Sequence, residues 1–385
     1  MASDSVVSGC DEGSMMVMIP PQWEEAANSI SSSAHPPISL ICGPKNSGKS
    51  TFSRHLLNTL LQRYETVAYL DTDVGQPEFS PPGCLSLHLI HDTLSDMMNP
   101  HIKTPERCFF FGDISSKGDP TAYLNYIFSL YDYFLEEYHQ SEYDSPGKSL
   151  FPLIINTPGW VKGTGFDVLV EMLRHIAPTY VVQIRISVES KNLPTGAFWL
   201  DEHDKAANLI EIHSAQRDFR DRSILMQKDA RRLRDHRLFN YFKQCFPSDL
   251  NIETNRELAR ALASLPPYEV SMSRIKVIHL HCEVQRSEIF HSLNATIVGL
   301  AVSSSGITRT QCHSPWCVGL GIVRGVDLKK DLVYVITPVP FCNLKKVDVL
   351  LQGFIEVPTA FLQVRGCVSP YMSTNVLHKL VGKES

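Results

Sequence analysis

The segment from residue 38 to residue 50 constrains the fold more than any other part of the chain. It joins a short apolar run, residues 38–42, to the loop sequence Gly-Pro-Lys-Asn-Ser-Gly-Lys-Ser, and a helical pattern follows over residues 51–63. A glycine-rich loop that lies between a strand and a helix and ends in Gly-Lys-Ser is typical of a phosphate-binding loop, or P-loop. Its backbone N–H groups and the positive end of the helix dipole both favour phosphate oxygens. The sequence therefore predicts a site for a nucleoside triphosphate, either ATP or GTP.

The chemistry of the P-loop side chains predicts their roles. Lys49 is expected to reach the outer phosphates, and the Ser50 hydroxyl is expected to hold Mg²⁺. The residues predicted to contact the triphosphate are Gly43, Pro44, Lys45, Asn46, Ser47, Gly48, Lys49, Ser50 and Thr51.

Alternating strand and helix patterns predict the fold around the P-loop. Strand patterns cover residues 38–42, 66–71, 84–90, 107–112, 151–156 and 180–186, and helical patterns cover residues 51–63, 120–135 and 166–176. This alternation is typical of an α/β P-loop NTPase fold, in which helices cover both faces of a mostly parallel sheet. Sites in such sheets lie at the carboxyl ends of the strands. Gly43, Asp71, Asp73 and Thr157 are all predicted to lie there.

The sequence pattern changes from charged and helical to β-rich after Pro266-Pro267, which predicts a second, smaller domain over residues 266–385. Its short β-rich runs are separated by Gly and Pro, as is typical of an all-β domain, and they cover residues 276–280, 296–302, 318–323, 332–337, 347–355 and 360–364. Residues 36–265 are assigned to the P-loop domain, whose charged stretch at residues 201–237 is predicted to be helical. Residues 1–35 are Ser-rich and polar, so we expect a flexible N-terminal lead-in.

Composition narrows the classes of partner. The net charge is −5, so any binding of nucleic acid must come from local basic patches. No apolar run approaches the ~20 residues that a membrane span needs, and no basic segment followed by an apolar run marks a secretory signal. The ten cysteines lack paired spacing, which favours a reducing compartment. We therefore expect no membrane partner.

Two carboxylates follow the strand predicted after the P-loop helix. Side chains at alternate positions share one side of a strand, so Asp71 and Asp73 can point into the same site. One can hold Mg²⁺, and the other can accept a proton from an attacking hydroxyl. For Asp71, capping of the next turn is the competing interpretation. Gln76 can orient the nucleophile or serve as an ordinary turn residue.

A GTP-dependent switch protein is disfavoured. The sequence has neither an Asn-Lys-x-Asp base-reading motif nor an Asp-x-x-Gly motif after the second strand. A kinase, a P-loop ATPase and a nucleotide-dependent scaffold remain.

Several segments together resemble the polynucleotide 5′-hydroxyl kinase family, which includes nucleolar pre-rRNA-processing kinases and Clp-type kinases of tRNA and mRNA 3′-end processing. They are the P-loop, Tyr-Leu-Asp-Thr-Asp-Val-Gly-Gln at residues 69–76, Phe-Ser-Pro-Pro-Gly at residues 79–83 and Asn-Thr-Pro-Gly-Trp-Val-Lys-Gly at residues 156–163. Residues 319–325 and 332–340 resemble the nucleolar branch more than the Clp branch. The likeness covers about residues 38–370.

The resemblance implies transfer of the γ-phosphate of ATP, with Mg²⁺, to the 5′-hydroxyl end of RNA or DNA. It also implies residence in the nucleus and nucleolus, and a nuclease partner in an RNA-processing complex. By position in the motifs, the catalytic residues would be Lys49, Asp71, Asp73 and Arg234, with Ser50 and Asp71 at the metal and Asp73 activating the 5′-hydroxyl. The acceptor would contact Gln76, Thr157, Gly159 and Trp160, the last three forming a clasp on the terminal nucleotides. An indole can stack on any base, which suits a sequence-tolerant enzyme.

Arg234 belongs to a basic helical segment that occupies the position of the family's lid. The family's Arg-x-x-x-Arg spacing is absent, and Arg231, Arg234 and Arg237 follow i, i+3 steps instead. Either spacing keeps arginines on one face of a helix. A solvated basic helix is the competing interpretation.

The alternative function is a catalytically weak assembly factor that binds ATP to lock its shape inside an RNA-processing complex. The Asp71/Asp73 pair and the clasp favour the enzyme, whereas the irregular lid spacing favours the assembly factor.

Overall fold

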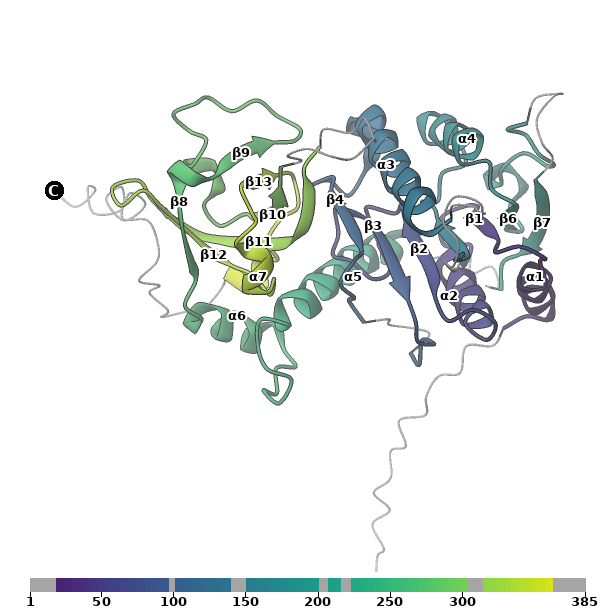
Figure 1. Cartoon of the computed structure of the whole chain (residues 1–385), viewed down its shortest axis with the longest axis horizontal. Helices are drawn as coiled ribbons and strands as arrows, with labels where there is room; N and C mark the ends of the chain where they lie inside the picture. Colours follow the sequence, from purple (N-terminus) through teal and green to yellow (C-terminus); the bar gives the residue numbers. More distant parts are fainter. Residues whose placement is uncertain are drawn as a thin grey trace, which may run out of the picture.

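The computed structural model describes residues 19–96, 101–139, 150–200, 207–215, 223–303 and 314–362. Two sheets lie side by side, and the long helix α5 (Ser223–Lys243) runs between and below them (Figure 1). All strands before residue 214 belong to the first sheet, and all strands after residue 267 belong to the second.

The first sheet has seven strands in the order β4-β3-β2-β5-β1-β6-β7. They are β1 (Ile38–Cys42), β2 (Val67–Asp71), β3 (Cys84–Ile90), β4 (Arg107–Phe110), β5 (Leu153–Asn156), β6 (Tyr180–Arg185) and β7 (Asn208–His213). The five strands from β2 to β7 in this order pair in parallel, and β3 pairs antiparallel with both β2 and β4. The predicted mostly parallel sheet is therefore confirmed.

Helices cover both faces of this sheet, which explains why its central strands are apolar on both sides. Helices α1 (Pro21–Ser31) and α2 (Lys49–Leu60) pack on one face, and α3 (Pro120–Tyr138) and α4 (Thr164–Ile176) pack on the other (Figure 1). Among the described residues, no helix is both long enough and apolar enough to cross a bilayer.

The second sheet has six strands in the order β8-β12-β11-β10-β13-β9. They are β8 (Tyr268–Ser271), β9 (Lys276–His279), β10 (Ile297–Val302), β11 (Trp316–Asp327), β12 (Leu332–Ile336) and β13 (Val349–Gln352). All pairs are antiparallel except β13 with β9. The remaining helices are α6 (Asn255–Ser264), α7 (Phe341–Leu344), α8 (Thr359–Leu362) and the 3₁₀ turns η1 (Ser116–Gly118), η2 (Glu189–Lys191), η3 (Met272–Arg274) and η4 (His291–Leu293).

The predicted flexible lead-in is wrong for residues 21–31, which form helix α1. Trp23, Ala27 and Ile30 recur at helical spacing and are buried against α2 and the sheet. The Trp23 indole Nε1 donates to the carbonyl of His213 at 2.8 Å, at the end of β7. The serine-rich composition concealed this apolar face.

Three other elements differ from the sequence predictions. Residues 208–213 form the edge strand β7 rather than helix: Leu209 packs on one face of the sheet, Ile210 and Ile212 pack on the other, and the backbone pairs in parallel with β6. Residues 359–362 form the helical turn α8 rather than a strand, and the rest of that predicted strand lies outside the described residues. Strand β8 was not predicted.

The boundary near Leu265 stays a prediction. Helices α5 and α6 precede it, yet their apolar side chains share one core with the second sheet and with Cys84 and Phe110 from the edge of the first. This shared core joins the two sheets.

Candidate active site

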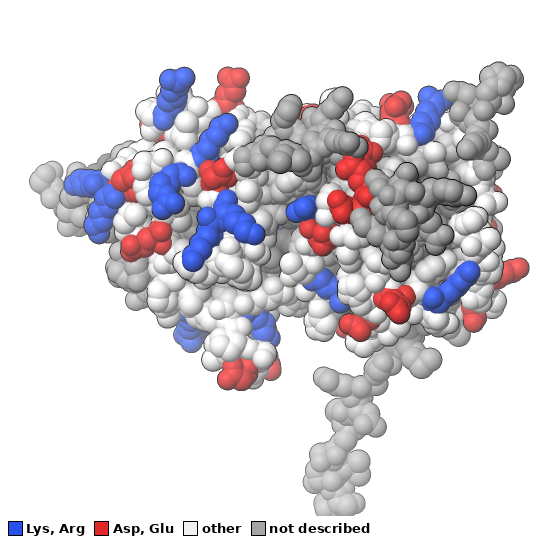
Figure 2. Space-filling model, in the orientation of Figure 1, with Lys and Arg blue, Asp and Glu red and all other residues white. Residues whose placement is uncertain are grey.

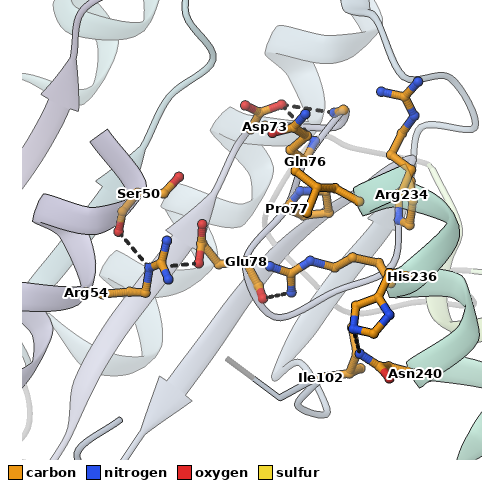
Figure 3. A pocket seen from close by; sticks show the side chains of 14 residues that line it. Ser50, Arg54, Asp73, Gln76, Pro77, Glu78, Ile102, Arg234, His236 and Asn240 are labelled. Atoms are coloured by element: carbon orange, nitrogen blue, oxygen red, sulfur yellow. Dashed lines mark hydrogen bonds and ion pairs between the residues drawn. The ribbon is translucent and has the colours of Figure 1, made fainter. Parts of the chain in front are cut away.

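A cavity of about 180 Å³ lies beyond the carboxyl end of β2, between the start of α2 and the middle of α5. Its lining includes Ser50 and Arg54 from α2, Asp73 and Gln76 from the turn after β2, and Arg234 from α5 (Figure 3). Three segments that are far apart in the sequence therefore meet at one site.

The P-loop connects β1 to α2 beside this cavity. Its backbone turns through Gly43 and through Gly48, which has a φ of 99° at the N-terminus of α2. Lys45 and Asn46 are exposed, Pro44 and Ser47 are buried, and Thr51 is half-buried in the first turn of α2. Within the described residues, the buried Ser47 hydroxyl has no hydrogen-bond partner. A buried hydroxyl of this kind is suited to a phosphate oxygen.

The Lys49 ammonium is buried inside the P-loop. Its Nζ donates to the carbonyls of Gly43 at 3.1 Å and Pro44 at 2.7 Å. Burial lowers the pKa of Lys49 to about 8, while the nearby carboxylate of Asp73 works in the opposite direction. The Lys49 ammonium is thus held next to the cavity by two carbonyl oxygens, each of which carries only a partial negative charge.

Asp71 is fully buried and does not line the cavity. Its Oδ1 accepts hydrogen bonds from the Asp73 backbone N–H at 3.2 Å and from Asn156 Nδ2 at 3.3 Å, and its Oδ2 accepts from the Glu78 backbone N–H. Burial, together with the Glu78 carboxylate, raises the pKa of Asp71 to about 8. In this arrangement Asp71 fixes the turn formed by residues 73–78.

Asp73 is half-buried and faces the cavity. Its Oδ1 accepts from the backbone N–H groups of Gly75 at 3.0 Å and Gln76 at 3.1 Å, which closes the turn. Among the described residues, Oδ2 has no hydrogen-bond partner. Burial raises the pKa of Asp73, and Lys49 opposes this shift. One carboxylate oxygen is thus fixed by the backbone and the other is left for a ligand.

Glu78 joins the turn after β2 to the helices on either side. Its carboxylate lies 3.3 Å from Arg54 Nε, which also donates to the Ser50 carbonyl at 3.1 Å (Figure 3). Its backbone carbonyl accepts a hydrogen bond from Arg237 of α5. Because both ion-pair partners are at most a tenth exposed, this contact is a structural one rather than a solvated surface pair.

The arginines of α5 therefore have different positions. Arg234 and Arg237 both line the cavity that contains Asp73, and Arg237 is in addition bound to the turn after β2. Arg231 lines a neighbouring groove toward residues 354–358, and Arg232 is exposed. Arg234 and Arg237 thus both share the cavity with Ser50 and Asp73, but the guanidinium of Arg237 already donates to the Glu78 carbonyl.

Thr157 and Gly159 hold the loop after β5 against the P-loop. The Thr157 hydroxyl donates to the Ile41 carbonyl at 2.7 Å, and Thr157 is buried. A Cβ atom on Gly159 would lie 2.5 Å from the Lys45 backbone, so only glycine allows this approach. These contacts position the loop, and they leave the Thr157 hydroxyl engaged with the backbone.

Trp160 is half-buried at the end of that loop. Its ring meets the edge of Tyr123 at a centroid distance of 5.2 Å. The Tyr123 hydroxyl donates to the Thr72 carbonyl at 2.6 Å, between Asp71 and Asp73. The predicted clasp and carboxylate pair are therefore joined through one buried tyrosine.

Two family models match the chain. Residues 43–244 match the P-loop of the mRNA cleavage and polyadenylation factor CLP1, and residues 263–358 match a NOL9-like C-terminal domain. A relative from Arabidopsis thaliana, named polynucleotide 5′-hydroxyl-kinase NOL9, is 54% identical over 363 residues, which cover 93% of this chain and 96% of that protein. The chain belongs to the NOL9 polynucleotide 5′-hydroxyl-kinase family.

Relatives of the same name in vertebrates are longer. Those from Danio rerio and Homo sapiens are 32% and 30% identical over 90% of this chain, which spans only 50% and 53% of their lengths. The NOL9 family assignment confirms the resemblance seen in the sequence.

Two solved structures of Clp1p with Pcf11p have the same fold. Their TM-scores are 0.58 and 0.59 at 16% identity, over 86% and 87% of this chain and 77% and 79% of theirs. One of them addresses the loss of ATP in a point mutant of Clp1p. At this identity the likeness shows the fold alone.

Several site residues of this NOL9 family member were not identified from the sequence. Glu78 and Arg54 carry ordinary charged side chains at positions without a motif, and Tyr123 looks like one of many core aromatics on α3. The acidic residue Glu78, two positions after the motif at residues 69–76, was the one available signal.

Proposed function

We propose that the chain transfers the γ-phosphate of ATP to the 5′-hydroxyl end of RNA, with Mg²⁺. The observation that supports this most strongly is the shared cavity of Ser50, Asp73 and Arg234, beside a P-loop that contains Lys49. Phosphoryl transfer requires positioning and electrostatic stabilisation more than covalent chemistry. A cation, a carboxylate and a metal-binding hydroxyl at one cavity supply those requirements.

The triphosphate would lie along the P-loop, with the Ser47 hydroxyl and the backbone N–H groups at residues 43–51 donating to its oxygens. Lys49 would exchange its bonds to the Gly43 and Pro44 carbonyls for bonds to phosphate. The Ser47 hydroxyl and the loop backbone are already in position, so the exchange of partners by Lys49 is the main change on binding.

The residues at the cavity fit a magnesium ion that Ser50 would hold directly and Asp73 would hold only through a water, so that Asp73 Oδ2 could still accept a proton. Both line the cavity, and Asp73 Oδ2 is free of partners among the described residues. Hydroxyl and carboxylate oxygens suit this hard cation. When bound, Mg²⁺ neutralises charge on the phosphates. The direct metal role expected for Asp71 is not kept in this proposal, because the oxygens of Asp71 already accept three N–H groups.

The acceptor end would lie between Asp73 and Trp160. The carboxylate of Asp73 accepts the proton of the 5′-hydroxyl as that oxygen bonds to phosphorus and the bond to ADP breaks. The terminal base would stack on the ring of Trp160, which is half-buried. Gln76, half-buried at the cavity, would orient the hydroxyl.

Local charge favours a polyanion despite the net charge of −5. On the face seen in Figure 2, Lys and Arg are more prominent over the second sheet, on the left, and Asp and Glu are more prominent on the right. A locally basic face attracts phosphate groups over about one Debye length. We expect the rest of the RNA strand to lie toward this side.

The proposal is tested by incubating the full chain with Mg²⁺, γ-labelled ATP and a 5′-hydroxyl oligonucleotide, as RNA and as DNA. Label is expected at the 5′ end of the RNA and none on an oligonucleotide that already carries a 5′-phosphate. If ATP binds but no label is transferred, the function is that of an ATP-binding assembly factor.

Arg234→Ala is expected to lower kcat about 10²-fold, because it removes a preorganised cation from the transferring phosphoryl group. Arg232→Ala is the matched control, since Arg232 lies on the same helix but is exposed and lines no cavity that contains Asp73. It should keep kcat within about twofold. Equal losses in the two variants would show that the helix contributes only general charge.

Trp160→Ala is expected to raise the KM for the oligonucleotide by roughly tenfold, since base stacking contributes ~1–3 kcal/mol. The KM for ATP should stay unchanged, and Trp160→Phe should restore most of the affinity. A selective loss of ATP affinity would contradict the clasp assignment. Thermal unfolding should be followed in parallel, because Trp160 also packs on Tyr123.

We place this activity in the processing of pre-rRNA in the nucleolus, within a complex that contains a nuclease. The support is the NOL9 name of the relatives and the Clp1p complexes that share the fold. Copurification of the tagged chain with nuclease activity and nucleolar RNA would test it.

A further inference from the structure

The C-terminal sheet meets the loop after β4 at a close contact between two backbone segments. Gly353, directly after β13, lies against Gly112, two residues after the end of β4. A Cβ atom on Gly353 would fall 2.3 Å from the Gly112 carbonyl oxygen and 2.5 Å from its Cα. No side chain fits in this contact, since real Cβ atoms do not approach backbone so closely.

Three backbone hydrogen bonds continue from this contact to the neighbour of Asp73. Phe354 N–H donates to the Gly112 carbonyl at 2.6 Å, Gly112 N–H donates to the Gly83 carbonyl at 3.0 Å, and Gly83 N–H donates to the Val74 carbonyl at 2.8 Å. Gly83 and Gly112 have φ values of 82° and 79°, which disfavour any residue with a side chain. We call Gly353, Gly112 and Gly83 the glycine bridge.

A second contact leads from the same loop to the same turn. The carbonyl of Ile114, two residues after Gly112, would lie 2.9 Å from a Cβ on Gly75. The Gly75 N–H is one of the two donors to Asp73 Oδ1. The loop that begins at Gly112 is therefore packed between the C-terminal sheet and the turn that fixes Asp73.

Two members of the bridge, Gly83 and Gly112, are buried, and Gly353 is half-buried, so their positions are not free to adjust independently. Ile355 is buried, and its side chain covers Gly83, where a Cβ would fall 2.7 Å from Ile355 Cγ1. Densely packed backbone of this kind transmits a displacement rather than absorbing it.

We propose that Gly353 is a positioning residue for phosphoryl transfer: through the glycine bridge, the C-terminal sheet holds the turn of Asp73 at the cavity. This inference rests on the proposed kinase function. A shift of about 1 Å in a catalytic group can cost ~10²-fold in rate, so a small displacement at Gly353 has a measurable effect at Asp73.

The test compares three glycine-to-alanine variants of the full chain. Gly353→Ala is expected to lower kcat about tenfold or more, with the KM for ATP within about twofold, because the P-loop lies outside the bridge. Gly321→Ala is the matched control for stability: its Cβ would fall 2.7 Å from Val335 within the second sheet. It should lower the unfolding temperature and leave kcat of the folded protein unchanged. Gly118→Ala, at a position with no atom within 4 Å, should change neither.

Backbone hydrogen exchange can be measured whether or not the chain transfers phosphate. In Gly353→Ala, amides of residues 74–78 and Gly83 should exchange faster, whereas Gly321→Ala should leave them unchanged. If the wild type transfers no phosphate, the kinase proposal fails and the exchange comparison still tests the bridge. If Gly353→Ala does not fold, the milder Ile355→Val is expected to give the same changes to a smaller extent.

The proposal is overturned if Gly353→Ala keeps the wild-type kcat and exchange. It is also overturned if its loss of kcat matches that of Gly321→Ala at equal loss of stability.

Discussion

Asp73→Asn is expected to reduce kcat for phosphate transfer to a 5′-hydroxyl oligonucleotide by roughly 10³-fold, because it removes the group that accepts the acceptor proton. The amide can keep its oxygen on the Gly75 and Gln76 N–H groups, so the turn should survive and ATP should still bind. The measurement is single-turnover transfer with saturating ATP and oligonucleotide.

The pH dependence of the same reaction gives an independent check. Asp73 must be ionised to accept a proton, and burial raises its pKa above the usual range for aspartate. The rate should therefore fall as the pH falls through that raised pKa, and the acidic limb should be absent from the residual activity of Asp73→Asn.

Asp132→Asn, an exposed carboxylate on α3, is the matched control and should retain the wild-type rate and profile. Wild-type activity in Asp73→Asn would remove Asp73 from the mechanism.

Lys49→Ala is expected to lower kcat/KM for ATP by roughly 10³-fold, because a buried cation that meets the outer phosphates acts both on binding and on the transition state. Lys330→Ala is the control, since the Lys330 side chain is 68% exposed and lies between β11 and β12, outside the P-loop. It should stay within about tenfold of the wild type.

The lowered pKa of Lys49 also predicts how the affinity for ATP changes with pH. In the free protein the ammonium form is lost as the pH rises through about 8, so ATP affinity should weaken above that pH. Lys49→Ala should lack this alkaline decline. An unchanged affinity for ATP in Lys49→Ala would place the nucleotide elsewhere.

The parts of the site that could be predicted from the sequence depend on local rules. A strand, a glycine loop and a helix define the P-loop, so Lys49 and Ser50 were identified without coordinates. The position of Asp73 follows from the strand that precedes it, and the structure places it at the cavity.

The parts that could not be predicted depend on contacts between distant segments. Glu78 becomes central because Arg54 and Arg237 approach it from two helices, which no spacing in the sequence indicates. The choice among the arginines of α5 required the direction of that helix relative to β2. Gly353 looks like an ordinary turn glycine until Gly112 is seen against it.

Secondary structure was mispredicted where composition and periodicity disagree. Helix α1 lies in a polar, serine-rich segment, yet four buried residues at helical spacing stabilise it against the sheet. Strand β7 lies in a charged segment, but pairing with β6 satisfies its backbone.

Helix α1 limits how far the chain can be shortened before the P-loop. Its Trp23 packs against Gly48 and donates a hydrogen bond to the His213 carbonyl at the end of β7. Trp23 therefore stabilises the first turn of α2 from outside the P-loop motif. A fragment cut to begin at the motif would leave Phe52 and Leu56 facing water, at about 1.5–3 kcal/mol for each large apolar side chain. The smallest working piece of this protein therefore begins before the first residue that touches nucleotide.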